Sequence, residues 1–337
     1  MPVISICLSP GFQRSLLIDA LELGEVNRIR VAEVDVSGKG INVARVLQRI
    51  GVDCVCLAQG GDNVAELAEL ARVEGLDLRF IASAGRLRTC TSIVEKPAGP
   101  TDTSSRVTEL VEPTAAVDAR CVDALRDALR GLLPQAPALV IAGSMAPGFP
   151  PDFQAQLAKL AHDAGVPVLI DLHGAALRAA IVAEPAVVKI NLAEFAATFL
   201  DARFAGGEHS GLLAAPELSH AVTDAVAQVS RQYATSFVLT RGANSVLLAR
   251  GGEVRVVGVP PLAARDVVNP IGSGDAFLAG LLAHLLADAA LAQGAPTLDQ
   301  LAPACALATA CAQSNARTAR PGFLEASFAA RVTTERR

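Results

Sequence analysis

Short apolar runs alternate with amphipathic segments along this chain, and this alternation limits the possible folds more than any other feature. The runs are Val3–Leu8, Cys54–Ala58, Ala138–Ala142, Val166–Asp171, Val187–Ile190 and Phe237–Leu239. A strand with one face in water alternates apolar and polar residues, whereas a parallel strand covered on both faces is apolar throughout. We therefore expect an α/β fold in which helices cover both faces of a mostly parallel sheet. Ligands of such sheets bind at the carboxyl ends of the strands.

Two segments do not fit this alternation. Residues 12–36 and 89–110 have the pattern of additional short strands, and we expect them to form a small flap beside the main sheet. Open α/β sheets often exceed the usual size of a domain. Residues 1–337 are therefore expected to form a single large domain that carries this small appendage.

Composition argues against several classes of function. Of the 337 residues, 51% are hydrophobic and 19% charged, so a large core can form without disulfides. The net charge is −5 and the Lys and Arg residues are scattered, which argues against nucleic acid or an anionic membrane as a partner. The seven cysteines form no C-x-x-C pair, as is typical of buried free thiols in a reducing cytoplasm.

Met1–Gly11 lacks the basic region of a signal peptide, and the apolar stretch Phe277–Ala287 is shorter than the ~20 residues of a membrane span. We expect a cytoplasmic protein.

A glycine-rich turn that leads directly into a helix, within Asn269–Gly280, carries the strongest chemical signal. Gly272 and Gly274 allow the backbone to approach a ligand closely, and the first N–H groups of the helix have no partner within it, so they form an anion pocket. Asp275, in the first helical turn, is placed to accept a proton from an attacking hydroxyl. The alternative is a helix-capping aspartate, which is the commoner role of a lone Gly-Asp pair.

Two other glycine patterns of nucleotide-binding proteins are missing from the sequence. The chain has no G-x-x-x-x-G-K-[ST] phosphate loop, and neither Gly38-x-Gly40 nor Gly272-x-Gly274 completes G-x-G-x-x-G. A P-loop NTPase and an ordinary NAD enzyme are therefore disfavoured. The segment Ser37–Arg45 again places glycines before a helix, and it predicts a second ligand-facing helix start.

Five segments resemble, in order and spacing, the signature segments of the ribokinase (PfkB) family of carbohydrate kinases. They are Ser37–Arg45 (family pattern G-G-K-G-x-N-x-A), Gly143–Gly148 (G-S-x-P-x-G), Lys189–Glu194 (K-P-N-x-x-E), Thr240–Ala243 (S-x-G-A) and Asn269–Gly280, which matches the family's G-A-G-D anion hole. The resemblance covers nearly the whole chain. It implies a ribokinase-like three-layer α/β/α fold with a small β lid, built by residues 12–36 and 89–110. Such lids often pair with the lid of a second subunit, which implies a homodimer.

Three further segments resemble one branch of this family, which phosphorylates ketohexoses that already carry a phosphate. They are Gly24–Arg28, Gly85–Thr89 and Val107–Leu110. Fructose 1-phosphate and tagatose 6-phosphate kinases are the type members of the branch. The resemblance therefore implies ATP-dependent phosphorylation of the hydroxymethyl group of such a sugar phosphate, with ATP and Mg²⁺ as cofactors.

The resemblance also implies roles for individual residues. Asp275 would be the general base, and the anion hole would be formed by Gly272, Ser273 and Gly274. The sugar phosphate would be bound by Gln13, Gly38, Lys39, Asn42 and Arg88, and the Arg88 guanidinium suits the substrate's existing phosphate. The nucleotide would lie beside Asn191, Thr240 and Gly242, and Glu194 would organise Mg²⁺. The alternatives are a helix-start Asn191, a solvated Glu194, a solvated Lys39 and an ordinary exposed Arg88.

The chain departs from the family pattern at a few positions. The family's N-P-x-x-D stretch is Ser9–Gln13 here, so Gln13 replaces a carboxylate that binds sugar hydroxyls. This replacement favours one alternative, a kinase of a non-phosphorylated sugar or a nucleoside. A non-catalytic ligand-binding member of the fold is a further alternative, which the intact Asp275 argues against. Ser37, Ile190 and Pro270 also differ from the pattern, but none of them removes a charged group.

Overall fold

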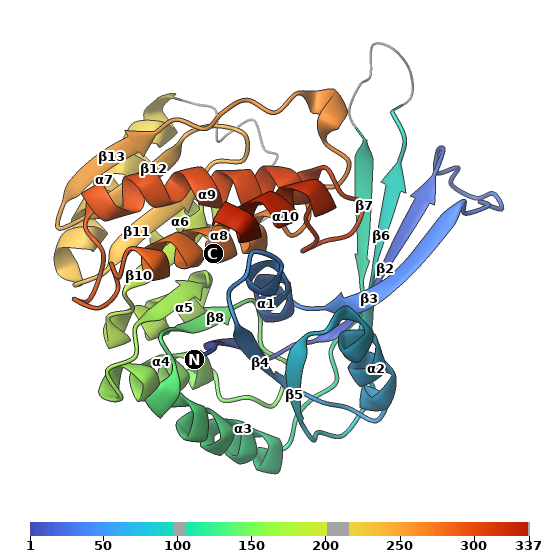
Figure 1. Ribbon diagram of the computed structural model, residues 1–337, viewed down its shortest axis with the longest axis horizontal. Coiled ribbons are helices and arrows are strands. Elements are labelled where there is room, and N and C mark those ends of the chain that lie inside the picture. Colours follow the sequence, from blue (N-terminus) through green and yellow to red (C-terminus); the bar gives the residue numbers. More distant parts are fainter. Residues whose placement is uncertain (98–104, 201–215, 336–337) are drawn as a thin grey trace.

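The structure, a computed structural model, describes residues 1–97, 105–200 and 216–335. Its main sheet contains nine strands in the order β13-β12-β11-β10-β9-β8-β1-β4-β5 (Figure 1). These strands are β1 (Val3–Cys7), β4 (Cys54–Gln59), β5 (Asp77–Ile81), β8 (Leu139–Ala142), β9 (Val168–Asp171), β10 (Val187–Asn191), β11 (Ser236–Thr240), β12 (Val246–Arg250) and β13 (Glu253–Val257). The strands from β11 to β5 are parallel, and β12 and β13 add an antiparallel edge. Each of the six apolar runs overlaps a strand of this sheet, so the mostly parallel sheet is confirmed.

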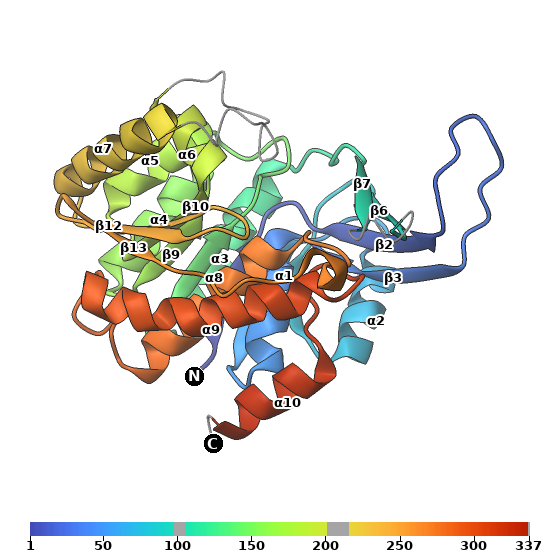
Figure 2. The ribbon, with the colours of Figure 1, turned by 90° about the horizontal axis from the view of Figure 1, so that it is seen from above.

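Helices cover both faces of this sheet. They are α1 (Lys39–Arg49), α2 (Val64–Glu74), α3 (Ala119–Leu132), α4 (Phe153–Asp163), α5 (Gly174–Ala180), α6 (Leu192–Phe199), α7 (Pro216–Gln232), α8 (Ser273–Ala287), α9 (Leu298–Ala316) and α10 (Ala326–Glu335). One apolar core joins the sheet to α3–α7, and a second joins it to α1, α8, α9 and α10. Figure 2 shows the sheet between these two layers. The expected three-layer α/β/α fold is confirmed.

A second, four-stranded sheet projects from the body (Figures 1 and 2). It has the order β3-β2-β6-β7, with β2 (Gly11–Ile18), β3 (Val31–Ser37), β6 (Arg88–Glu95) and β7 (Arg106–Val111). The connection between β2 and β3 extends farthest from the body (Figure 2). These strands come from the two segments that broke the alternation of the sequence, and we call this sheet the lid.

Several features were not predicted from the sequence. Strands β5, β12 and β13 lie at or beside the edges of the main sheet. Because β5 and β13 are partly exposed, they contain polar residues and lack the apolar run that marks a buried strand. All seven cysteines are free, but Cys54 is partly exposed because it begins β4, which corrects the expectation that every thiol is buried. None of the described helices is long and apolar enough to cross a membrane. The assignment of residues 1–337 to a single domain stays a prediction.

Candidate active site

The turn before α8 is held tightly against the C-terminal part of the chain. Gly272 is the N-cap of α8 and has a φ of +83°, a conformation that glycine adopts at low cost. A side chain there would also meet the backbone nitrogen of Gly322 at 2.6 Å. Asn315, fully buried in α9, donates to the Ile271 carbonyl at 2.9 Å and accepts from the Gly322 N–H at 2.7 Å. Asn315 therefore fixes the turn, a role that sequence reasoning missed.

The start of α8 has the character of an anion hole. The backbone N–H groups of Gly274 and Asp275 have no hydrogen-bond partner among the described residues. The hydroxyl of Ser273 lies 3.1 Å from the Asn315 amide nitrogen, which holds it at the helix start. A side chain at position 274 would meet the Lys189 ammonium at 2.8 Å, so this cation lies against the turn. Two free N–H donors beside a cation favour a bound anion.

Asp275 is buried, with 4% of its surface exposed, although it lies in the first turn of α8. Its Oδ2 accepts a hydrogen bond of 2.8 Å from the Asn42 side-chain amide. Burial raises the pKa of the Asp275 carboxyl to about 6, although the nearby Lys39 ammonium lowers it. The helix is capped by Gly272 instead, so the alternative of a capping aspartate is wrong. A buried carboxylate with a pKa close to neutrality can accept a proton.

A chain of buried side chains orients Asn42 toward Asp275. Arg45 is fully buried, and its Nη1 donates to Asn42 Oδ1 at 2.9 Å while its Nε donates to Glu74 at 2.7 Å. A guanidinium can only donate, so the acceptor atom of Asn42 must face Arg45 and its NH₂ group must face Asp275. The contacts that run from Glu74 on α2 through α1 thus provide the Asp275 carboxylate on α8 with a hydrogen-bond donor, the Asn42 amide. Arg45 is a second residue whose role the sequence did not reveal.

Asp171, the last residue of β9, joins two cations, Lys189 of β10 and Lys39 at the start of α1. Its side chain is 1% exposed and lies 2.9 Å from the Lys189 ammonium and 3.6 Å from that of Lys39. Burial opposes ionisation of Asp171, but the two ammonium groups hold the pKa of its carboxyl below the ordinary value. The Asp171 carboxylate in turn raises the pKa of Lys39, which stays charged. Both cations therefore remain fixed beside Asp275.

A cavity of about 150 Å³ opens beside this cluster. Its lining includes Ser9, Lys39, Arg88 and Ser144. The Arg88 Nη2 donates to the Ser9 carbonyl at 3.2 Å, and its buried Nε has no partner among the described residues. Arg88 is therefore partly buried beside Lys39 and is not an ordinary exposed arginine. Two cations and two hydroxyls around a small cavity suit a phosphate group.

The residues expected beside the nucleotide lie at the ends of two neighbouring strands. Asn191 ends β10 and Thr240 ends β11, and the two are paired in register. Asn191 and Glu194 also form a reciprocal capping box at the start of α6, with 2.8 Å from the Glu194 N–H to the Asn191 side chain. Asn191 is therefore a helix-start residue, and its place beside the nucleotide stays a prediction. Gly242, with a φ of +59°, follows β11 and has open space where a side chain would be.

Whether the described residues suit Mg²⁺ depends on the carboxylates that they place near the proposed phosphate sites. No cluster of three or more Asp, Glu, His or Cys side chains occurs in the part of the chain that the structure describes. Mg²⁺ in phosphate-transferring sites is usually held by one or two carboxylates together with substrate phosphates and waters. Glu194 lies close enough to Lys39 to affect the pKa of that ammonium. A single carboxylate near the cationic cluster fits that mode of binding.

Gln13 lies on the lid, and Gly38 is the N-cap of α1. Gln13 is buried, and its amide nitrogen donates to the Ser92 hydroxyl of β6 at 2.9 Å. In the ladder Gln13 is paired with Asp35 of β3, which forms an ion pair with Arg320 of the C-terminal segment. Among the described residues Gln13 makes no hydrogen bond to Asp275, Lys39 or Arg88.

Comparisons with known proteins show the family of this chain and its fold. Residues 12–321 match the sequence profile described as pfkB family carbohydrate kinase. The chain is 30% identical over 286 residues to the 1-phosphofructokinase of Rhodobacter capsulatus, covering 83% of this chain and 82% of that protein. A possible 1-phosphofructokinase from Thermotoga maritima has a similar structure, with a TM-score of 0.77 and 20% identity over 99% of this chain and 98% of that chain. Ribokinase from Giardia lamblia has a TM-score of 0.71 at 14% identity, over 99% and 98% of the two chains. The fold is ribokinase-like, and the chain belongs to the pfkB family of carbohydrate kinases.

Proposed function

We propose that this kinase transfers the γ-phosphoryl group of ATP to the hydroxymethyl group of a ketohexose phosphate, of the fructose 1-phosphate or tagatose 6-phosphate type. The observation that carries the proposal is the buried Asp275 carboxyl, whose pKa is raised to about 6, next to the free N–H groups at the start of α8. A base and an anion hole at one point are the two features that in-line phosphoryl transfer requires.

The proposed reaction uses Asp275 as the general base. The hydroxymethyl oxygen of the sugar attacks the γ-phosphorus, its proton passes to Asp275, and the bond to the bridging oxygen breaks to release ADP. The N–H groups around Gly272, Ser273 and Gly274 would stabilise the charge on the transferred phosphoryl group. Lys189, whose ammonium lies beside Gly274, would add positive charge at the same place. These groups are held before the substrate binds, so they need little reorganisation.

The sugar phosphate would lie between α1 and the lid. Its existing phosphate fits the cavity lined by Ser9, Lys39, Arg88 and Ser144, because both charged residues of that cavity are cations. Gly38 and Asn42, at the start of α1, would face the sugar, and Gln13 would contact its hydroxyls from the lid. The relative from Rhodobacter capsulatus, named 1-phosphofructokinase, supports a phosphorylated ketohexose as the acceptor.

The nucleotide would bind across the ends of β10 and β11, beside Asn191, Thr240 and Gly242. Mg²⁺ bound to the triphosphate would supply charge neutralisation, and Glu194 would hold it through water. Glu194 already accepts a hydrogen bond at one oxygen from the Asn191 N–H, at 3.3 Å, so its carboxylate is held in place.

An ADP-release assay over a panel of acceptors tests this function. The panel contains fructose 1-phosphate, tagatose 6-phosphate, fructose 6-phosphate, unphosphorylated fructose and adenosine. We expect a phosphorylated ketohexose to have the highest kcat/KM, because the cationic cavity contributes only when a phosphate is present. Equal use of fructose or adenosine would instead support the alternative acceptors, and no ADP release with any acceptor would support a ligand-binding role.

We also propose that two copies of the chain associate through their lids. The hairpin between β2 and β3 exposes Leu23 and Val26 at 89% and 81%, and Ile29 nearby at 45%. Strands β3 and β7 add further exposed apolar residues, among them Val31 and Val111. Exposed apolar residues gathered on one projecting element are typical of a protein–protein contact.

We propose further that the enzyme works in a reducing cytoplasm, because its seven cysteines are free.

A further inference from the structure

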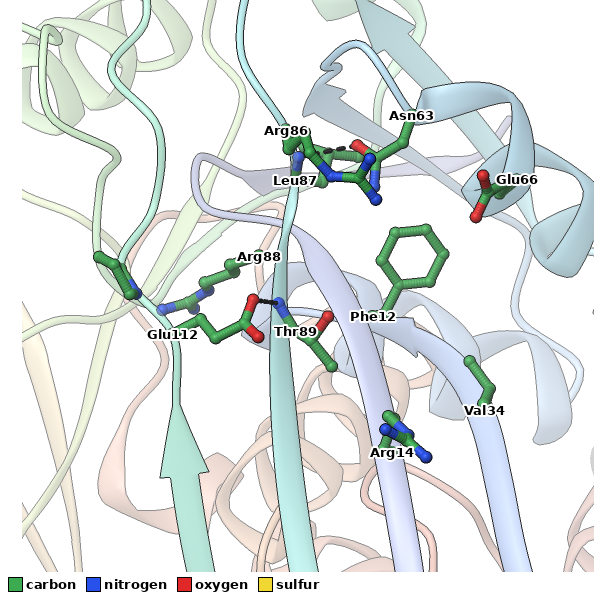
Figure 3. Close-up of a pocket in the computed structure, with 11 residues that line it drawn as sticks. Phe12, Arg14, Val34, Asn63, Glu66, Arg86, Leu87, Arg88, Thr89 and Glu112 are labelled. Carbon is green, nitrogen blue, oxygen red and sulfur yellow. Dashed lines mark hydrogen bonds between the residues drawn. The ribbon is translucent and has the colours of Figure 1, made fainter.

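A second and larger cavity, of about 550 Å³, lies where the lid joins the body (Figure 3). Its walls come from lid strands β2, β3 and β6, from the N-terminal end of α2 and from the segment that precedes β6. The volume is within the range of sites for small molecules. The cavity shares Arg88 with the proposed substrate-phosphate cavity, but none of its other lining residues.

This cavity opens on the face of the lid that is turned away from Gln13. Successive residues of a strand point to opposite faces, so Phe12 and Arg14 lie on the face opposite to Gln13. Residues paired in register share a face, which adds Val34 of β3 and Thr89 of β6 to the Phe12 side. All four of these residues line the cavity. The larger cavity is therefore separate from the face that is proposed to cover the sugar.

The charged side chains of this cavity leave positive charge uncompensated. The Arg14 and Arg86 side chains make no hydrogen bond or ion pair within the described residues, and the buried Nε of Arg88 lacks a partner there too. Glu112, by contrast, accepts a 2.8 Å hydrogen bond from the Thr89 N–H, which occupies one of its oxygens. Glu66 also lines the cavity, so three guanidinium groups face two carboxylates.

The positions of these arginines suit a ligand that bridges two parts of the molecule. Arg14 belongs to the lid, whereas Arg86 belongs to the segment that Asn63 holds through a 2.8 Å hydrogen bond to the Leu87 N–H. In Figure 3 the Phe12 ring lies between the Arg86 and Arg14 side chains. A guanidinium group can bind two phosphate oxygens at once. An apolar ring between two such groups suits the carbon skeleton of the same ligand.

From this arrangement we infer that the cavity at the base of the lid is a second binding site, distinct from the active site, for a small phosphorylated metabolite. Arg14 and Arg86, on the two sides of Phe12, hold the anionic groups of the ligand, and its carbon skeleton packs on Phe12. Because Arg88 lines both cavities, a ligand here alters how Arg88 meets the substrate's phosphate. Occupation of the site therefore changes the KM for the sugar phosphate, a consequence that rests on the proposed function.

Calorimetric titration tests the inference without turnover. Inorganic phosphate, glucose 6-phosphate and AMP are the three probes, and they distinguish the phosphate alone from a sugar phosphate and a nucleotide. The double variant Arg14→Ala/Arg86→Ala is compared with Arg72→Ala/Arg130→Ala, which removes the same charge from exposed positions on α2 and α3. We expect at least one probe to lose about tenfold or more in affinity in the first variant and none in the second. The probe with the largest loss identifies the source of the phosphate.

Two results would overturn the inference. The first is that every probe binds the Arg14→Ala/Arg86→Ala variant as tightly as wild type, while Lys39→Met abolishes binding, because the anion would then occupy the active site alone. The second is a KM for the sugar phosphate that responds to the probe equally in wild type and in the double variant. If no acceptor were phosphorylated at all, the calorimetric comparison would still decide whether the site exists, so failure of the proposed function is distinguishable.

Discussion

The Asp275 carboxyl is the residue on which the proposed chemistry depends, and its ionisation gives a pH prediction. A general base must be unprotonated, and burial raises the pKa of Asp275 to about 6. We expect kcat to be constant above this pH and to fall about tenfold for each unit below it. The substrate's phosphate also ionises near pH 6, so its pKa must be measured separately, by phosphorus NMR. A kcat that stays constant down to pH 4.5 would contradict the assignment.

The same carboxyl should make folding less favourable as pH rises. The folded-state pKa is raised above the ordinary value of 3.8, so the folded protein binds the proton more tightly than the unfolded chain. The cost of ionising the buried group is thus absent below about pH 4 and fully present above about pH 6. We expect the Asp275→Asn variant to gain stability over wild type through this window, measured by urea unfolding at several pH values. A difference in unfolding free energy that is independent of pH would contradict this.

Arg45 is expected to act on the base through Asn42. In Arg45→Lys the ammonium can still pair with Glu74, but it cannot also hold Asn42, so the amide donor to Asp275 loses its orientation. Loss of one hydrogen bond to the carboxylate should raise the apparent pKa in the kcat profile by about 1 unit, or ~1.4 kcal/mol. The substrate's own phosphate is unchanged in this variant, so a shift identifies an enzyme group. Arg49→Lys on the same helix is the control, and equal profiles for both variants would remove Arg45 from the mechanism.

At the level of elements, the ion pair between Asp35 of β3 and Arg320 connects the lid to the C-terminal segment that packs against Gly272. The Asp35 side chain is 3% exposed, so removal of Arg320 leaves a buried charge unpaired. We expect Arg320→Ala to raise the KM for the sugar phosphate about tenfold, and to raise ATP hydrolysis without acceptor because water enters a looser site. Arg317→Ala, which breaks the exposed pair with Glu325, should change neither quantity. Identical kinetics of the two variants would show that the lid does not depend on Arg320.

The elements also show what the sequence could predict. The strands that are buried on both faces were predictable, because burial requires an apolar run, and the lid was predictable as an interruption of that pattern. Asp171 and Lys189 were missed as site residues, although a charge within or at the end of an apolar strand was a usable signal. Arg45 and Asn315 gave no such signal. Their roles depend on partners such as Glu74 and Gly322, which only the packing of α1, α2 and α9 brings into contact.

At the scale of the whole molecule, the projecting lid predicts self-association. In sedimentation equilibrium we expect wild type to be a dimer, and Leu23→Glu/Val26→Glu to be a monomer, since the charges would have to be buried on association. Val73→Glu/Val182→Glu changes two valines outside the lid that are 71% and 69% exposed, and this variant should stay dimeric. A wild type that is monomeric at micromolar concentration, or a lid variant that sediments like the control, would contradict a dimer through the lid.

The central claim for the molecule is that the buried carboxylate at the start of α8 is the base of a working kinase. It is tested most directly by the turnover of the Asp275→Asn variant with its best sugar phosphate, with substrate affinity and unfolding measured on the same sample. The amide keeps the volume but cannot accept the proton, so we predict a loss in kcat of at least ~10²–10⁴-fold, with ATP binding and the fold retained. Asp288→Asn, at the other end of α8, should retain full activity. A folded Asp275→Asn variant with near-normal turnover would contradict the account.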